Sequence, residues 1–410
     1  MPGRNPIGHV RRHWRAYVAL HLAVVGVVVA SAFALTLPMD RDPAARASRA
    51  PLVAPLPPGV RSLDGVLEPI RAARNVPALA AAIVEGDHLV AIGAVGVRKG
   101  GTSVRVTVGD RFHIGSCTKS MTATLIGLLV DEGRLRWDST IAEVLPELAG
   151  RIRPEYDAVT VDQLLRHASG LPDDRRDLLL LWRYRALRGP LTRQRLALAE
   201  IALRQRPAAP RGARSVYSNA GYCILGAMAE RVTGQSWETL MRRRIFEPLG
   251  MTSAGFGSPS AAGTLQQPWG HVALGRAVGR MRADCGDHLP ACVGPAGNVS
   301  LSLADWARYA SLHLQAERGR CRLLSCATLR HLHRASPGSL YACGWGTGTY
   351  EGLGPVLQHA GSEGSWYATI GIAPARDLAI LTATNEGDPA GGQACGAAVD
   401  TLVRRWGAGR

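Results

Sequence analysis

The chain has 410 residues, a formal net charge of +16 at pH 7 and a sequence pI of about 10.2. Its 46% hydrophobic and 20% charged residues are typical of a globular protein and exclude general disorder. The arginines are scattered, without a basic run interleaved with aromatic residues, a zinc finger or a recognition helix. We therefore expect no nucleic-acid partner, and only a weak attraction to anionic surfaces.

The first 60 residues form three segments of different composition. Residues 1–15 carry four arginines and no acidic residue, residues 16–37 are almost wholly apolar, and residues 38–60 contain six prolines. The apolar segment would span about 33 Å as a helix, enough to cross the hydrocarbon core. The positive flank predicts a cytoplasmic N-terminus and an exported remainder. We expect a transmembrane signal anchor at the inner membrane. A signal peptide cleaved at Ala30-Ser31-Ala32, which releases a secreted or periplasmic protein, is the alternative.

Residues 38–60 have the composition of a stiff tether, so the folded domain is expected over residues 61–410. Apolar runs at 78–84 and 88–97 flank Gly86-Asp87 and predict an antiparallel hairpin. A helix is expected from 116 to 132, and a mainly helical region over 140–335. Four further strands are expected at 345–349, 356–358, 365–372 and 378–384, followed by a closing helix at 396–406. Strands near both ends with helices between them predict an antiparallel sheet with a helical insertion, of the α/β (α+β) class.

Ser116 and Lys119 form the first candidate catalytic pair. Residues at positions i and i+3 of a helix share one face, so Lys119 can reach the Ser116 hydroxyl. A serine beside an easily deprotonated lysine is an activated nucleophile. Only two of the 48 basic residues are lysines, Lys99 and Lys119, and arginine cannot accept a proton in a protein. The retention of lysine at position 119 therefore indicates a task that arginine cannot perform.

Two further motifs carry polar groups suited to the same chemistry. The Tyr217-Ser218-Asn219 motif precedes an apolar helix, where Tyr217 can relay a proton and Asn219 can bind a substrate amide or Lys119. A buried tyrosine followed by a helix cap is the plain structural alternative. His359-Ala360-Gly361 leads through Ser362 into a strand whose edge can supply backbone N–H groups to an oxyanion. Here the structural alternative is a histidine at a strand end beside a glycine turn.

Together these motifs resemble the class C β-lactamase-related serine hydrolases, which include penicillin-binding carboxypeptidases, D-amino-acid peptidases and family VIII esterases. The family pattern of Ser-x-x-Lys, Tyr-x-Asn and Lys- or His-x-Gly is similar to Ser116/Lys119, Tyr217/Asn219 and His359/Gly361. The resemblance covers about residues 65–405, and segments 173–205 and 280–294 depart from it. Four further segments also resemble the family sequence: Phe112-His113-Ile114-Gly115, Leu164-Leu165-Arg166-His167-Ala168-Ser169-Gly170-Leu171-Pro172, Phe246-Glu247-Pro248-Leu249-Gly250-Met251 and Pro295-Ala296-Gly297.

The resemblance implies a β-lactamase/transpeptidase-like fold, in which an antiparallel sheet is flanked by helices and an all-helical subdomain forms the other wall of the cleft. It implies that Ser116 is acylated, that Lys119 and Tyr217 handle protons, and that the N–H groups of Ser116 and Ser362 form the oxyanion hole. His359 stands where true β-lactamases carry lysine, which argues against strong β-lactamase activity. The departing segments are expected to form idiosyncratic walls of the cleft.

The expected activity is hydrolysis of an ester, amide or D-peptide bond in a small-molecule or peptide substrate. A weak β-lactamase or D,D-carboxypeptidase is the second enzyme hypothesis, and a catalytically silent sensor or binding domain is the non-enzyme hypothesis. Among the eight cysteines no Cys-x-x-Cys pair occurs, so neither a metal nor a cofactor is expected. Cys285 with Cys292 and Cys321 with Cys326 are candidate local disulfides, against the alternative that all eight are buried thiols. The sequence leaves the oligomeric state open.

Overall fold

The computed structural model describes residues 56–175, 177–273, 281–284 and 289–407. The basic N-terminus, the predicted membrane segment 16–37 and most of the tether 38–60 lie outside these residues. Within the described ranges, no helix combines the length and the apolar composition needed to cross a bilayer.

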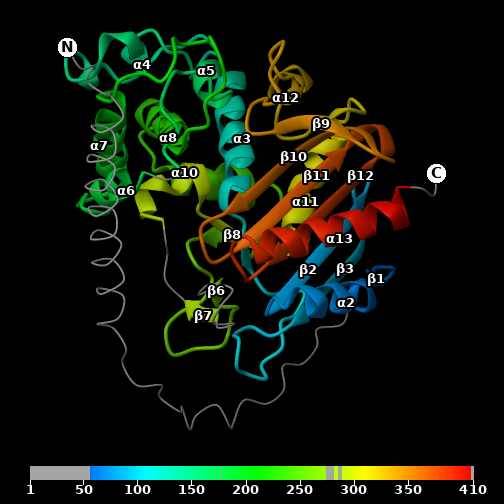
Figure 1. Ribbon diagram of the computed structural model, residues 1–410. Helices are drawn as coiled ribbons and strands as arrows, with labels where there is room; N and C mark the ends of the chain where they lie inside the picture. Colours follow the sequence, from blue (N-terminus) through cyan, green and yellow to red (C-terminus); the bar gives the residue numbers. More distant parts are fainter. Residues whose placement is uncertain (1–55, 176, 274–280, 285–288, 408–410) are drawn as a thin grey trace, which may run out of the picture. The chain divides into compact units, whose positions relative to one another are not determined.

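A seven-stranded sheet forms one half of the described domain, in the order β1-β3-β2-β12-β11-β10-β9 (Figure 1). β1 pairs in parallel with β3, and the other neighbours are antiparallel. The pairing of β2 with β12 joins the two ends of the domain at the sheet centre, as the sequence predicted. The strands are β1 (Arg61–Ser62), β2 (Ala78–Glu85), β3 (His88–Gly96), β9 (Gly346–Tyr350), β10 (Gly354–Ser362), β11 (Tyr367–Ala373) and β12 (Leu378–Thr384).

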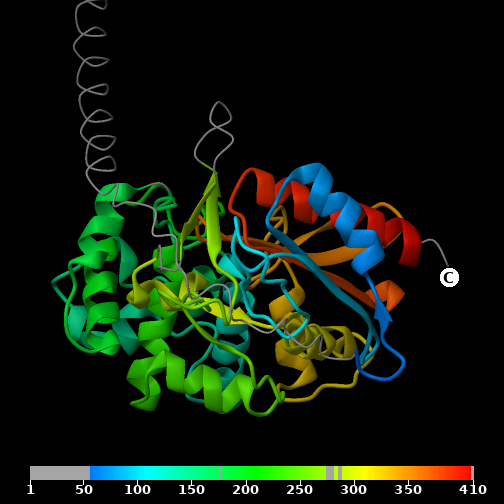
Figure 2. The ribbon, with the colours of Figure 1, turned by 90° about the horizontal axis from the view of Figure 1, so that it is seen from below.

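Helices cover both faces of this sheet because its central strands are apolar on both sides. α2 (Asp64–Arg74) and α13 (Ala390–Trp406) pack on one face, and α11 (Leu303–Ala316) packs on the other (Figure 2). Successive residues of β2 accordingly enter different cores: Ala81 and Ile83 face the α13 side, whereas Ala80 and Ala82 join the larger core on the other side.

The second half of the domain is mainly helical and surrounds α8 (Asn219–Thr233), whose residues 220–230 are all buried. Arg195 of α7 is fully buried between the carboxylates of Glu230 and Glu238, which links α7, α8 and α9. The remaining helices are α3 (Thr118–Asp131), α4 (Ile141–Val144), α5 (Val161–Leu165), α6 (Leu178–Arg185), α7 (Leu191–Leu203), α9 (Trp237–Met241), α10 (Gly294–Gly297) and α12 (Cys326–His333). Short strands form two small sheets, β4 (Phe112–His113) with β8 (Val299–Leu301) and β5 (Gly255–Phe256), and β6 (Gly270–Ala273) with β7 (Met281–Asp284).

Three boundaries differ from the sequence prediction. Residues 115–117 form a 3₁₀ turn, and the α-helix that was expected from Ser116 begins at Thr118. β10 continues through Ser362, so the His359-Ala360-Gly361 motif lies inside a strand and not after one. α13 begins at Ala390, six residues before the expected start, because glycines 391, 392 and 396 mask its helical pattern.

The cysteines divide between one disulfide and buried thiols. Cys321, which precedes α12, forms a disulfide with Cys326, the first residue of that helix. This bond is one of the two candidate bridges. Cys292 is a buried thiol, and Cys285 lies outside the described residues. The other described thiols, at positions 117, 223, 343 and 395, are also buried.

Candidate active site

Ser116 lies in a 3₁₀ turn that two neighbouring segments hold in place. The Gly115 N–H donates to His113 Nδ1 (3.1 Å), and the Nε2–H of the same ring then donates to Asn298 Oδ1 (3.1 Å). Gly115 has φ +49°, and a Cβ there would lie 2.6 Å from the backbone nitrogen of Ser362. Glycine is therefore required at position 115, since any side chain would push β10 away from the nucleophile.

Lys119 lies one turn after Ser116, at the start of α3, and its side chain is fully buried. Its Nζ lies 3.1 Å from Ser116 Oγ, 2.8 Å from Asn219 Oδ1 and 2.7 Å from the carbonyl oxygen of Ala296. The last two atoms only accept hydrogen bonds, whereas the serine hydroxyl can also donate. In the structure the Lys119 ammonium donates to all three oxygens, and a lysine that has given up one proton keeps two N–H donors for Asn219 and Ala296 and a lone pair for the Ser116 hydroxyl. The contacts therefore suit a lysine that accepts the proton of Ser116.

The start of α8 brings Tyr217 and Asn219 to the same lysine. Nζ of Lys119 lies 4.7 Å from the centroid of the Tyr217 ring. The carboxylate of Asp174 accepts the backbone N–H groups of Asn219 (2.8 Å) and Ala220 (2.7 Å), which orients the Asn219 side chain toward Lys119. Burial raises the pKa of Asp174, although the two amide hydrogen bonds and the charge of Lys119 oppose that rise.

His167 fixes the backbone on both sides of Tyr217. Its carbonyl oxygen accepts the N–H of Val216 (2.8 Å), and its Nδ1 accepts the N–H of Ser218 (3.2 Å). The ring centroids of His167 and Tyr217 are 4.3 Å apart. Burial lowers the pKa of His167 well below its usual range, with a further contribution from the positive charge of Lys119. The neutral ring keeps the lone pair that accepts from Ser218.

β10 forms the opposite wall of the site. β9 pairs with β10 only from Gly354 to Gln358, so within the described sheet residues 359–362 pair with β11 alone and leave a free edge. A Cβ on Gly361 would lie 2.6 Å from the backbone nitrogen of Ser116. The backbone of β10 therefore packs directly against the turn that carries Ser116, as an oxyanion hole built from backbone N–H groups of both segments requires.

His359 is neutral and already hydrogen-bonded on both sides. Its Nδ1–H donates to the carbonyl of Ala360 (2.7 Å), so its Nε2 accepts the Tyr341 hydroxyl (3.0 Å). Burial, together with a smaller effect of the nearby charge of Lys119, lowers the pKa of His359 to about 4. This residue cannot supply the permanent positive charge that a lysine would place at the same position.

Cys117 follows the nucleophile but is chemically quiet. Its side chain is fully buried, and its Sγ lies 3.5 Å from the carbonyl oxygen of His359. Burial raises the pKa of the thiol far above its ordinary value. Because the thiolate is the reactive form of cysteine, the hydroxyl of Ser116 is the available nucleophile of this turn.

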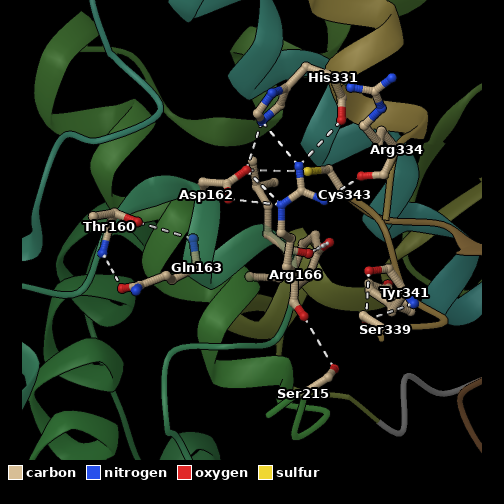
Figure 3. Close-up of polar contacts among 12 residues, drawn as sticks. Thr160, Asp162, Gln163, Arg166, Ser215, His331, Arg334, Ser339, Tyr341 and Cys343 are labelled. Atoms are coloured by element: carbon tan, nitrogen blue, oxygen red, sulfur yellow. Dashed lines mark hydrogen bonds and ion pairs between the residues drawn. The ribbon is translucent and has the colours of Figure 1, made fainter. Parts of the chain in front are cut away.

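Asp162 of α5, His331 of α12 and Cys343 form a separate cluster (Figure 3). Their ligand-type atoms lie within 4.8 Å of one another. The guanidinium of Arg166 lies among them, with Nε 2.8 Å from both Asp162 oxygens and a terminal nitrogen 3.3 Å from His331 Nε2. This positive charge already neutralises the carboxylate and would repel a metal ion, so we interpret the cluster as an ion-paired link between α5 and α12.

A family model described as Beta-lactamase matches residues 63–403. The chain belongs to the beta-lactamase family. Penicillin-binding protein 4 of Amycolatopsis lactamdurans is 33% identical to this family member over an aligned length of 335 residues, and the alignment covers 78% of this chain and 83% of that protein. As its family resemblance implied, the chain is a serine hydrolase that acts through an acyl-enzyme on ester, amide or D-peptide bonds.

Solved structures confirm the expected fold. The octameric penicillin-binding protein homologue from Pyrococcus abyssi has a TM-score of 0.68 at 24% identity, covering 83% of this chain and 76% of that chain. The D-amino acid amidase from Ochrobactrum anthropi SV3, complexed with L-phenylalanine amide, has a TM-score of 0.67 at 22% identity, covering 83% and 96%. At these identities the likeness establishes the architecture of the beta-lactamase family.

The structure brings all the predicted site residues to one place, at the junction of α3, the start of α8 and the free edge of β10. Sequence reasoning missed Asp174 and assigned no role to His167 or Tyr341. Asp174 lies in a segment whose sequence departs from the family, so no local motif indicated its hydrogen bonds to the start of α8. Ala296 was noted only as part of a Pro-Ala-Gly string, because the sequence cannot show where a backbone carbonyl points.

Proposed function

We propose that Ser116 attacks the carbonyl carbon of the substrate while Lys119 accepts its proton, and that Tyr217 passes a proton to the leaving group. The observation that carries this proposal is the 3.1 Å contact between Lys119 Nζ and Ser116 Oγ, with the other two contacts of Nζ fixed by Asn219 and Ala296. The backbone N–H groups of Ser116 and Ser362 then stabilise the oxyanion. Water hydrolyses the acyl-enzyme in a second step.

For the substrate, we propose an ester or amide that carries no carboxylate, including D-amino-acid amides, in preference to penicillins. The amidase and penicillin-binding relatives support acyl transfer from amides in general. The neutral His359 supports the choice between them, since it offers no positive charge to the carboxylate that a penicillin carries. Weak β-lactamase activity remains the second enzyme hypothesis.

We also propose that the catalytic domain is exported and held at the membrane by residues 16–37. The four arginines before this apolar segment support the orientation. The Cys321–Cys326 disulfide supports an oxidising compartment, where such bonds persist. Fractionation followed by N-terminal sequencing tests this proposal: a soluble exported protein beginning near residue 33 would contradict the anchor, and a cytoplasmic protein would contradict export.

Covalent labelling tests the nucleophile. A fluorophosphonate should label the purified protein at Ser116, and Ser116→Ala should abolish both labelling and turnover. Cys117→Ala is the matched control, because the buried thiol of Cys117 has no expected chemical role. Turnover of p-nitrophenyl esters, D-amino-acid anilides and nitrocefin then ranks the substrate classes. Labelling without turnover of any of them would favour the silent binding domain, and undiminished hydrolysis by Ser116→Ala would refute the nucleophile.

A further inference from the structure

An apolar groove of about 500 Å³ lies on the face of the sheet that α13 covers. Residues of β10, β11 and β12 form its floor, α13 forms its side, and the lining continues around the edge of β10 to His359. Val356, Leu378, Ile380 and Val403 supply apolar side chains to the lining. A groove of this volume can hold a small organic group.

Two glycines keep this groove open. Gly371 of β11 and Gly396 of α13 both line it, and a Cβ added at either position would meet no atom within 4 Å. A glycine inside a strand or a helix destabilises the fold relative to alanine. Larger side chains would fit at both positions, so close backbone packing does not explain why glycine occupies them.

The groove is continuous with the catalytic machinery. Tyr217 and His359 belong to its lining, together with Tyr341, whose hydroxyl donates to His359. It thus begins at the free edge of β10, beside the residue proposed to move a proton to the leaving group, and extends across the sheet toward β12.

We propose that this groove binds an uncharged, apolar chain on the leaving-group side of the substrate, a specificity that rests on the proposed acyl-enzyme mechanism. In acylation the bond from Ser116 Oγ to the carbonyl carbon forms as the bond from that carbon to the leaving oxygen or nitrogen breaks. The leaving atom receives the proton that Ser116 loses, through Lys119 and Tyr217. The leaving group therefore faces Tyr217, where the groove begins.

The charge of the lining agrees with an uncharged ligand. Asp400 of α13 contributes a carboxylate, to which the Tyr350 hydroxyl donates. His359 at the other part of the lining is neutral. A leaving group with its own carboxylate would be repelled by Asp400, and the described lining residues include no lysine or arginine to offset that repulsion, whereas an alkyl or aryl group fits the apolar walls.

Isomeric esters test which side of the substrate enters the groove. Butyl and hexyl acetate have the same formulae as ethyl butanoate and ethyl hexanoate, so each pair differs only in the side that carries the chain. A fully buried methylene contributes up to about fourfold in kcat/KM. We expect kcat/KM to rise at least about tenfold from ethyl to hexyl acetate, and to change less than about threefold from ethyl acetate to ethyl hexanoate.

Gly371→Leu and Gly396→Leu fill the groove without touching the catalytic residues. Both should remove the gain with hexyl acetate and keep the rate with ethyl acetate, measured by pH-stat and checked by thermal unfolding. Gly65→Leu is the control, because Gly65 is an exposed helical glycine on α2 with equal free space. An unchanged chain-length profile in both groove variants, or a preference that follows the acyl chain, overturns the proposal. If the wild-type protein showed no Ser116-dependent hydrolysis of any of these esters, the proposed function itself would be contradicted.

Discussion

The carboxylate of Asp174 holds the backbone of Asn219: Oδ1 lies 2.8 Å from the Asn219 nitrogen, and Oδ2 lies 2.7 Å from the nitrogen of Ala220. Both N–H groups belong to the first turn of α8 and have no partner within the helix. A buried carboxylate is favoured there because it satisfies two donors and faces the positive end of the helix. Through Asn219 this arrangement fixes one of the three contacts of Lys119.

Asp174→Asn should lower both stability and activity. An amide group keeps one acceptor oxygen and turns an NH₂ group toward a backbone N–H, so one buried donor loses its partner, at a cost of about 1–3 kcal/mol in the free energy of unfolding. We expect kcat for an activated ester to fall at least about tenfold. Asp173→Asn is the control, because Asp173 is exposed and pairs with Arg175 at the surface. Equal behaviour of the two variants in urea unfolding and steady-state kinetics would contradict the role of Asp174.

Lys119→Arg distinguishes a base from a fixed positive charge. Arginine keeps its proton in proteins, so it cannot accept the proton of Ser116. We expect the single-turnover acylation rate to fall at least about a hundredfold, since general-base assistance is worth about 10²–10⁴. Lys99→Arg is the control at the one other lysine, which lies over the Trp269 ring. A Lys119→Arg protein within a few-fold of wild type would move the base role to Tyr217.

Tyr217→Phe separates a proton relay from a single base. The contacts of Lys119 Nζ go to Ser116, Asn219 and Ala296, while the Tyr217 ring lies beside it. The loss of the hydroxyl should therefore slow acylation less than Lys119→Arg does, and the loss should grow as the leaving group becomes more basic. Rates with p-nitrophenyl and ethyl esters measure that difference. An equal loss with both esters would exclude proton donation by Tyr217 to the leaving group.

His359 should make the folded state sensitive to acid. Its pKa is about 4 in the folded protein against an ordinary value of 6.5, so between these values the unfolded chain binds a proton that the folded chain excludes. The stability that its neutral form contributes is complete above pH 6.5 and is lost as the pH falls toward 4, by up to about 3 kcal/mol. His359→Gln should flatten that part of the urea-unfolding profile. The exposed His88→Gln should leave it unchanged, and equal profiles for wild type and His359→Gln would refute the assignment.

His167 should tolerate asparagine better than valine. Its backbone is left-handed, with φ +57°, which asparagine accepts more readily than a β-branched residue does. Asparagine also retains an acceptor for the Ser218 N–H, which valine lacks. We expect His167→Asn to retain more kcat and more stability than His167→Val, with KM changed less than kcat in both. Equal losses in kinetics and thermal unfolding would show that His167 acts only by filling space.

The sequence by itself determined the local parts of this protein. The spacing of Ser116 and Lys119 places them one turn apart. Ser218 caps α8, because its side-chain oxygen accepts the N–H of Gly221. The hairpin of β2 and β3 and the strand β12 follow from short apolar runs between turn residues. These features were predictable because they depend on residues within a few positions of one another.

The tertiary structure decided which distant groups complete the site. The carbonyl of Ala296 reaches Lys119 across 177 positions, and Asp174 reaches Asn219 across 45. Neither contact leaves a pattern in the sequence, because every residue has a carbonyl and most aspartates are exposed. The neutral state of His359 and the groove beside Gly371 depend likewise on burial and on packing between α13 and the sheet. Desolvation and close packing exist only once the chain has folded, so they decide the chemistry that the motifs alone leave open.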